Sequence, residues 1–497
     1  MDRCRNISEI FRHAICVAAL MWTAIINGQA FLFSDSTNYI RAADMALHIA
    51  SGRTFSTEWT KRPQQELKGA TQKEPTATPP SARHNDLKHG MIMAGRSPYF
   101  GALMYGGYLT SNFWAFLALQ SLIAYILIIL SLNRFGVGSS GNILAVVVAL
   151  AATTTLPYYN SLLMPDAFFS FGILSFVLLC TPGKLSSGQV WFLSLVLVTS
   201  AVAHVHSLAV IAGLVLTLVV CWLVGWQAKI PRRGLIAAIL AVIIGLASVQ
   251  VTALATEAAF GKKPQFVPVL TARVIADGPG MAFIQSGCEG DRFQICRVHI
   301  GEPRNAGAIL SGTTYESGAY LLASPSERKR MGLEDRAFAL AVMTTYPAWQ
   351  SSKIIRNTVQ QLLWIEYDGL NTGCFDAAQC WNSLPPNVRK DLRVSASGQS
   401  AWPASLMNLV LCAVVLLSVI ALTILWPTLW KTSPRMARWL RMWIILIVAG
   451  MLGNAILGGA GVEPQYRYQG RLIWLLPLLA SILVLLRLRG ARPKGEL

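Results

Sequence analysis

Residues 403–427 read PASLMNLVLCAVVLLSVIALTILWP and contain no charged side chain. About 20 consecutive apolar residues in a helix are enough to cross the hydrocarbon core of a bilayer. A helix also satisfies its own backbone hydrogen bonds, which a lipid environment requires. This stretch therefore predicts a transmembrane helix and indicates an integral membrane protein.

Similar apolar runs recur along the chain. The candidate spans are residues 11–33, 112–133, 139–157, 163–181, 188–203, 206–226, 234–256, 403–427, 437–459 and 472–488. The composition agrees, because the 497 residues are 54% hydrophobic and only 13% charged, whereas soluble domains carry roughly 25% charged residues. We predict an all-α polytopic membrane protein with about ten transmembrane helices.

The basic residues predict the orientation of these helices. The net charge is +18, but the cations lie in short loops and tails, where they interact with anionic lipid headgroups rather than with nucleic acid. With ten spans they all fall on one side: Arg3, Arg5, Arg12, Arg134, Lys184, Lys229, Arg232, Arg233, Lys431, Arg435, Arg438, Arg441, Arg487, Arg489, Arg492 and Lys494. The positive-inside rule makes that side, and both termini, cytoplasmic. We expect a bacterial inner (plasma) membrane, with the endoplasmic reticulum as the alternative.

Two long segments then lie outside the membrane. The first, residues 34–111, begins with apolar residues at helical spacing, which predicts an amphipathic helix on the membrane surface. A polar, proline-rich insertion follows at residues 57–96 and is expected to be mobile. The predicted domains are 1–256, an N-terminal transmembrane module of about seven helices with outer loop 34–111; 257–402, an extracytoplasmic loop domain; and 403–497, a C-terminal module of about three helices.

The loop domain contains two closely spaced pairs of cysteines. Cys288 precedes Cys296, and Cys374 precedes Cys380, all within polar sequence. Paired cysteines in an oxidising compartment indicate two local disulfides; free thiols are the alternative. Zinc is disfavoured because neither pair has CxxC spacing. We expect a mixed fold here, with a helix over residues 333–364.

Two acids lie at the predicted outer membrane surface, where burial of a charge is costly. Asp35 follows the first span, and Asp166 follows Pro165 at the start of the fourth. Each has a purely structural alternative, since Asp35 is placed to cap the next helix and a Pro-Asp pair is a common helix opening. Because both acids belong to the same face, they are candidates for one site.

Further polar residues are predicted on the same face. His204 and His206 lie in the outer turn between two spans, and Arg467 and Arg471 precede the last span. The histidines are otherwise interfacial, and the arginines otherwise snorkel to the membrane surface. A cation in a short outer loop breaks the charge pattern, however, and arginine binds phosphate in bidentate fashion. The arginines are therefore candidate ligands of a lipid phosphate.

Four short motifs in one order resemble the GT-C superfamily of polytopic membrane glycosyltransferases, which use polyprenyl- or dolichyl-phosphate sugars. Asp35 stands within Ser34-Asp35-Ser36, Arg96 opens Arg96-Ser97-Pro98-Tyr99, Asp166 follows Met164-Pro165, and Arg467 lies in Tyr466-Arg467-Tyr468. The resemblance in layout covers nearly the whole chain.

The resemblance implies transfer of a sugar to an extracytoplasmic glycan, lipid or protein by an inverting displacement. Asp35 would be the general base, with a pKa raised by the low dielectric near the headgroups. Arg467 and Arg471 would hold the donor phosphate, and Asp166 would orient the acceptor or assist a divalent metal, Mg²⁺ or Mn²⁺. Candidate substrate-binding side chains are Tyr39, His204, His206 and Tyr468.

The chain lacks a second acid close to Asp35, which departs from the family pattern and leaves two alternatives open. Many members carry two acids close together in the first outer loop, whereas Asp44 is nine residues from Asp35 and points to the opposite face of a helix. An inactive GT-C-like assembly partner is therefore one alternative. A transporter or flippase of a lipid-linked glycan is the other, although such proteins usually show paired repeats and broken helices, and no repeat is visible here.

Overall fold

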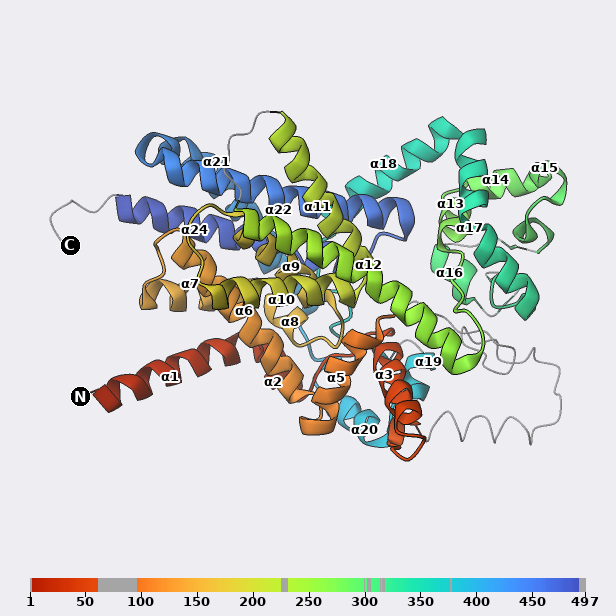
Figure 1. The fold of residues 1–497 in the computed structure, drawn as a ribbon, viewed down its shortest axis with the longest axis horizontal. Helices are drawn as coiled ribbons and strands as arrows, with labels where there is room; N and C mark the ends of the chain where they lie inside the picture. Colours follow the sequence, from red (N-terminus) through yellow and green to blue (C-terminus); the bar gives the residue numbers. More distant parts are fainter. Residues whose placement is uncertain are drawn as a thin grey trace.

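The computed structural model describes residues 2–60, 96–224, 231–298, 300–301, 305–312, 314, 318–375 and 378–490. This described part is helical, and its β-structure is limited to an isolated bridge between Phe31 and Leu162. The predicted all-α class is confirmed. Figure 1 shows a bundle of long helices from which one group of shorter helices, α13 to α17, projects at one end.

The second to tenth predicted spans each coincide with a helix. They are α6 (Trp114–Arg134), α7 (Ser140–Thr153), α9 (Asp166–Cys180), α10 (Ser187–Ala203), α11 (Val205–Leu223), α12 (Arg232–Phe260), α21 (Ala404–Thr432), α22 (Pro434–Gly461) and α24 (Leu475–Gly490). Within the described residues, five helical stretches are long and apolar enough to cross a membrane: α6, α12, α21, α22 and Tyr466–Arg489. The full count of ten crossings stays a prediction.

The first predicted span, residues 11–33, is not one continuous helix. It is divided by a turn into α1 (Asp2–Ala19) and α2 (Trp22–Asn27). The carbonyl of Leu20 at this break accepts a hydrogen bond from the side chain of Asn160, at 2.9 Å. Buried backbone groups need such partners. Hydropathy alone does not register a polar partner from a distant helix, so the expectation of a single helix was wrong.

Helix α9 forms the centre of the bundle. All of its side chains are buried, and it packs against α6, α10, α11, α12 and α22. A Cβ at Gly172 would lie 2.3 Å from Oγ of Ser200, so only glycine allows α10 to approach this closely. Small residues allow such close packing in lipid, where apolar burial alone does not hold helices together. Asp166 is the first residue of α9.

The predicted amphipathic helix is present as α3 (Ser36–Ala50), and it packs against α5 (Pro98–Ser111). Asp44 of α3 is buried and accepts hydrogen bonds from Tyr105 at 2.6 Å and Thr57 at 2.7 Å. Asp44 therefore belongs to a structural cluster separate from Asp35. Of the predicted insertion 57–96, residues 61–95 lie outside the described part of the chain.

The projecting group has its own hydrophobic core around Phe283, Phe293 and Phe338. Its helices are α13 (Val269–Ala276), α14 (Pro279–Gln285), α15 (Cys288–Asp291), η1 (Gln294–Arg297), α16 (Ala306–Ser311) and α17 (Pro325–Thr345). The described residues of 257–402 contain no strand, so the expected mixed fold was wrong for this part.

The remaining helices of the segment 257–402 are α18 (Pro347–Leu363), α19 (Ala378–Ser383) and α20 (Pro386–Val394). The helix expected over residues 333–364 is broken between α17 and α18, where Pro347 cannot continue the hydrogen-bond ladder. Both predicted disulfides are present, Cys288–Cys296 and Cys374–Cys380.

Several of the predicted cytoplasmic cations meet at one end of the bundle. Arg134 donates to the carbonyl of Thr181 at 2.6 Å, and Arg489 donates to the carbonyl of Gly136 at 2.6 Å. In Figure 1 the start of α1 and the end of α24 also lie at this end, opposite α13 to α17. Arg134, Arg489 and the start of α1 therefore lie at one end of the molecule, and the side of the membrane that they face stays a prediction.

Candidate functional site

The carboxylate of Asp35 lies at the start of α3 but does not cap that helix. Asp35 occupies the N-cap position without a side-chain cap bond. Its Oδ2 lies 2.5 Å from Nη2 of Arg96, which directly precedes α5. The expectation that Asp35 caps the next helix is therefore wrong, because its side chain turns toward a cation from another segment of the chain.

Arg467 meets the same carboxylate from the other end of the chain. It lies on α23 (Tyr466–Gly470), one turn before the last span, and its Nη2 is 3.9 Å from Oδ2 of Asp35. Its guanidinium lies 4.3 Å from the ring centre of Phe33 and 5.2 Å from that of Tyr468. Nε and Nη1 are buried and have no hydrogen-bond partner among the described residues. These are donors without an acceptor.

Arg471, one turn further on, is engaged with protein partners. Its Nη1 lies 3.2 Å from Oδ1 of Asp166, and its Nη2 donates to Oδ1 of Asn454 at 2.9 Å. The side chain of Asp166 is only 1% exposed. This buried pair joins α9 and α22 to the segment before α24. Both arginines have a buried Nε without a hydrogen-bond partner among the described residues, but only Arg467 also has an unpartnered Nη1.

The other predicted side chains surround the two arginines. The ring of His206 lies 5.8 Å from the rings of Tyr468 and Phe169, and His204 lies beside it at 6.3 Å. Tyr39 is fully buried on α3, and its hydroxyl has no hydrogen-bond partner within the described part of the chain. The structure thus gathers these residues near Asp35, and their roles in binding stay predictions.

A third carboxylate, Asp368, also borders this cluster and was missed from the sequence. It follows α18 in an irregular loop and is half-buried. The hydroxyl of Tyr158 donates to its backbone carbonyl, and Arg467 is close enough for its charge to act on the carboxylate. An Asp-Gly pair in a polar loop usually indicates only a turn, so no sequence signal separated Asp368 from other loop acids.

The two accessible carboxylates have opposite pKa shifts. Burial raises the pKa of Asp35, but the charges of Arg96 and Arg467 outweigh it and lower the pKa to about 2. The expectation of a raised pKa for Asp35 was wrong because two cations stand beside it. Burial also raises the pKa of Asp368, and there the opposing effect of Arg467 is too weak to reverse it.

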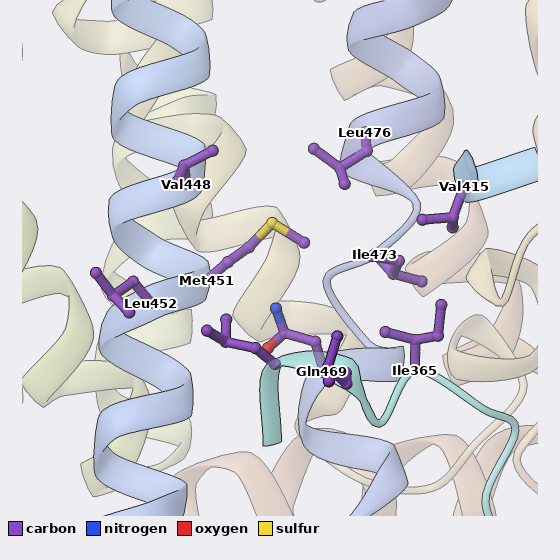
Figure 2. A pocket seen from close by; sticks show the side chains of 10 residues that line it. Ile365, Val415, Val448, Met451, Leu452, Gln469, Ile473 and Leu476 are labelled. Atoms are coloured by element: carbon purple, nitrogen blue, oxygen red, sulfur yellow. The ribbon is translucent and has the colours of Figure 1, made fainter. Parts of the chain in front are cut away.

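An apolar pocket of about 340 Å³ lies next to this cluster, between α18, α21, α22 and α24 (Figure 2). It is lined by Leu362, Leu363, Ile365, Val415, Val448, Met451, Leu452, Gln469, Ile473 and Leu476. Leu363, Val448 and Leu452 are exposed on the flank of the bundle. Its polar residue, Gln469, accepts a hydrogen bond from Asn454 at 2.9 Å, and Asn454 also bonds Arg471. The pocket is therefore linked to Arg471 by a chain of two hydrogen bonds through Gln469 and Asn454.

A divalent metal was considered from the sequence. Among the described residues, no three His, Cys, Asp or Glu side chains are grouped to hold an ion. Asp35 and Asp166 each face an arginine instead. This arrangement does not fit a Mg²⁺ or Mn²⁺ site formed by these acids.

Comparisons with known proteins find one structure of low similarity. No family model and no curated protein matches the sequence. A search of solved structures finds the crystal structure of ArnT from Cupriavidus metallidurans bound to undecaprenyl phosphate. The alignment has 10% identity, covers 90% of this chain and 77% of that chain, and has a TM-score of 0.32. This similarity is too low to transfer a fold or a ligand.

Proposed function

We propose that this protein is an integral membrane glycosyltransferase of the GT-C kind. It takes a sugar from a polyprenyl-phosphate donor and transfers it, with inversion, to an extracytoplasmic glycan, lipid or protein acceptor. The site around Asp35 and Arg467 faces away from the cytoplasm, in a bacterial inner membrane with both termini inside.

The observation that carries this proposal is the unsatisfied guanidinium of Arg467. Leaving a buried donor without a partner costs about 1–3 kcal/mol, and more for a charged group. A phosphate oxygen would accept from Nε and Nη1, which have no partner among the described residues. The planar guanidinium is suited to bidentate phosphate binding.

The apolar pocket supports a phosphate attached to a lipid. Its lining is apolar apart from Gln469, and its edge is exposed where lipid surrounds the bundle. An isoprenoid tail in this pocket would place its phosphate toward the arginines. A soluble sugar nucleotide has no group that needs such a surface.

In the proposed reaction, an acceptor hydroxyl attacks the anomeric carbon while the bond from that carbon to the phosphate oxygen breaks. The electron pair of that bond stays on the lipid phosphate, where Arg467 stabilises the developing charge. The leaving group is already weakly basic, so it needs no protonation. A carboxylate of the site receives the proton of the acceptor.

The first test is the binding of undecaprenyl phosphate to the purified protein in nanodiscs. Charge-assisted hydrogen bonds contribute about 1.5–3 kcal/mol, so Arg467→Gln is expected to weaken binding by roughly tenfold or more. Arg330→Gln is the matched control, because Arg330 is a half-exposed surface arginine paired with Glu334. Equal binding by wild type and Arg467→Gln would contradict the proposal.

The second test is turnover. Undecaprenyl-phosphate mannose, glucose, galactose and arabinose are supplied in turn with membrane extracts as acceptor, and release of undecaprenyl phosphate is measured. The wild type is expected to consume at least one donor. Binding without consumption of any of them would count against an enzyme and favour the inactive assembly partner.

A further inference from the structure

The proposed transfer needs a base, and Asp35 is poorly placed to be one. Its Oδ2 is occupied by Arg96 at 2.5 Å and approached by Arg467 at 3.9 Å. Its Oδ1 lies 3.5 Å from the amide nitrogen of Asn38. A carboxylate that already neutralises two guanidiniums has little affinity for a proton. Its chemistry suits holding the arginines in position.

Asp368 is held beside the same arginine in a different way. Its backbone carbonyl is anchored by the hydroxyl of Tyr158. The next residue, Gly369, has a φ of 83°, and a Cβ there would lie 3.4 Å from the ring of Phe33. The loop is therefore pressed onto the ring that faces Arg467. No salt bridge joins the carboxylate of Asp368 to an arginine among the described residues, whereas Asp35 has two.

We propose that Asp368 is the general base of the transfer and that Asp35 is a positioning residue for Arg96 and Arg467. This inference rests on the proposed function. The acceptor hydroxyl gives its proton to Asp368 as its oxygen bonds the anomeric carbon. The bond between that carbon and the phosphate oxygen breaks, and both of its electrons leave with the lipid phosphate held by Arg467.

The surroundings of Asp368 suit this role. The charged and titratable groups that face it are Arg467 on α23, Asp166 on α9, and Tyr158 and Tyr159 on α8 (Leu156–Asn160). Burial raises the pKa of Asp368, the charge of Asp166 adds to this effect, and Arg467 opposes it. A base whose pKa is closer to the working pH accepts a proton more effectively. Asp368 is also half-buried, so an acceptor can reach it.

The inference is tested with Asp368→Asn, Asp368→Glu, Asp35→Asn and a matched control, Glu366→Gln. Glu366 lies in the same loop and bonds Asn408 at 3.3 Å, outside the proposed machinery. Each protein is assayed in nanodiscs for binding of undecaprenyl phosphate and for its release from the donor that the wild type consumes, across a range of pH. Infrared difference spectra between wild type and each Asp→Asn variant report the protonation of that carboxylate.

We expect Asp368→Asn to bind undecaprenyl phosphate normally while its turnover falls by about 100-fold or more, as loss of a general base predicts. Asp368→Glu should recover part of this loss, and Glu366→Gln should match the wild type. Asp35→Asn should instead weaken binding of the lipid phosphate, and its turnover should still fall at low pH as in the wild type. In the infrared titration, Asp368 should protonate at a higher pH than Asp35.

Three results separate the inference from the proposed function. Full turnover by Asp368→Asn overturns the inference and leaves the transferase intact. If turnover by Asp35→Asn no longer falls at low pH, while turnover by Asp368→Asn still does, the general base is Asp35. If the wild type consumes no donor, the result counts against the proposed function. The infrared titration then tests the inference by itself. The inference is overturned if Asp368 becomes protonated at the same pH as Asp35 or at a lower one.

Discussion

Arg467 and Asp35 come from opposite ends of the chain, yet Nη2 of the arginine lies 3.9 Å from Oδ2 of the aspartate. The same oxygen accepts from Arg96 at 2.5 Å. One carboxylate thus holds two guanidiniums together, although like charges repel. This arrangement places Arg467, whose other nitrogens are unpartnered in the described chain, where an anionic ligand would complete its coordination.

The ion pair between Arg96 and Asp35 should control the titration of the aspartate. The pKa of Asp35 is lowered from 3.8 to about 2, so its stabilising effect is present above pH 4 and is lost as the pH falls through about 2. Arg96→Gln should move the pKa of Asp35 up toward its ordinary value. It should also lower the free energy of unfolding at neutral pH by about 2 kcal/mol. Infrared titration checks this, and an unmoved pKa would show that Arg467 alone controls Asp35.

The close approach of α3 and α5 should depend on one glycine. A Cβ at Gly101 would lie 2.2 Å from the carbonyl oxygen of Tyr39, whereas a Cβ at Gly106 on the same helix meets nothing within 4 Å. Gly101→Ala is expected to destabilise the protein by about 1–3 kcal/mol and to weaken binding of undecaprenyl phosphate by displacing Arg96. Gly106→Ala should be neutral or slightly stabilising. Thermal unfolding of both variants would show whether they differ; equal stability would contradict the packing described.

The two disulfides should have different functional effects. Sγ of Cys380 lies 3.5 Å from the carbonyl oxygen of Phe33, two residues before Asp35. Cys288–Cys296 belongs to the separate core of the projecting helices. Replacing Cys374 and Cys380 by serine should therefore weaken undecaprenyl phosphate binding more than the same change in the other pair. If both double variants bind equally, the first disulfide does not support the site.

The buried pair of Arg471 and Asp166 should contribute to folding as a unit. Removing one partner leaves a buried charge uncompensated, which costs about 3–5 kcal/mol. Asp166→Asn should therefore destabilise the protein strongly, and adding Arg471→Met should recover part of that loss. A double-mutant cycle by thermal unfolding measures the coupling. Simple additivity of the two changes would mean that the pair is not coupled.

A bulky side chain in the apolar pocket should weaken binding of a ligand with a lipid tail but not of a free phosphate. Met451 lines the pocket, while Leu417 of α21 is exposed on the outside of the bundle. Met451→Trp should weaken binding of undecaprenyl phosphate but not of inorganic phosphate, because only the former has a tail to exclude. Leu417→Trp, the control, should leave both unchanged. A uniform loss of both ligands in Met451→Trp would indicate a folding defect instead.

Some of these features follow from local sequence. Apolar runs such as 403–427 form helices because lipid demands internally bonded backbone, whatever the neighbours are. The cysteine pairs are close enough in sequence to join without knowledge of the fold. The outer helix that begins after Asp35 was visible in its apolar spacing.

Other features depended on distant partners. The break after Ala19 coincides with a side chain of α8 that satisfies a backbone carbonyl, and no hydropathy pattern records this. Asp35 was considered a helix cap or a base with a raised pKa, and two arginines from other segments changed both expectations. Asp368 stood in an ordinary loop motif, and only its neighbours distinguish it.

Most of the helices and both cysteine pairs could be predicted from local sequence. These properties arise from the chain's interaction with lipid, water and its own near neighbours. Only the tertiary structure decided which carboxylate is neutralised and which is not. The protonation of Asp35 depends on guanidiniums a few ångströms away in space, and folding alone brings those charges together.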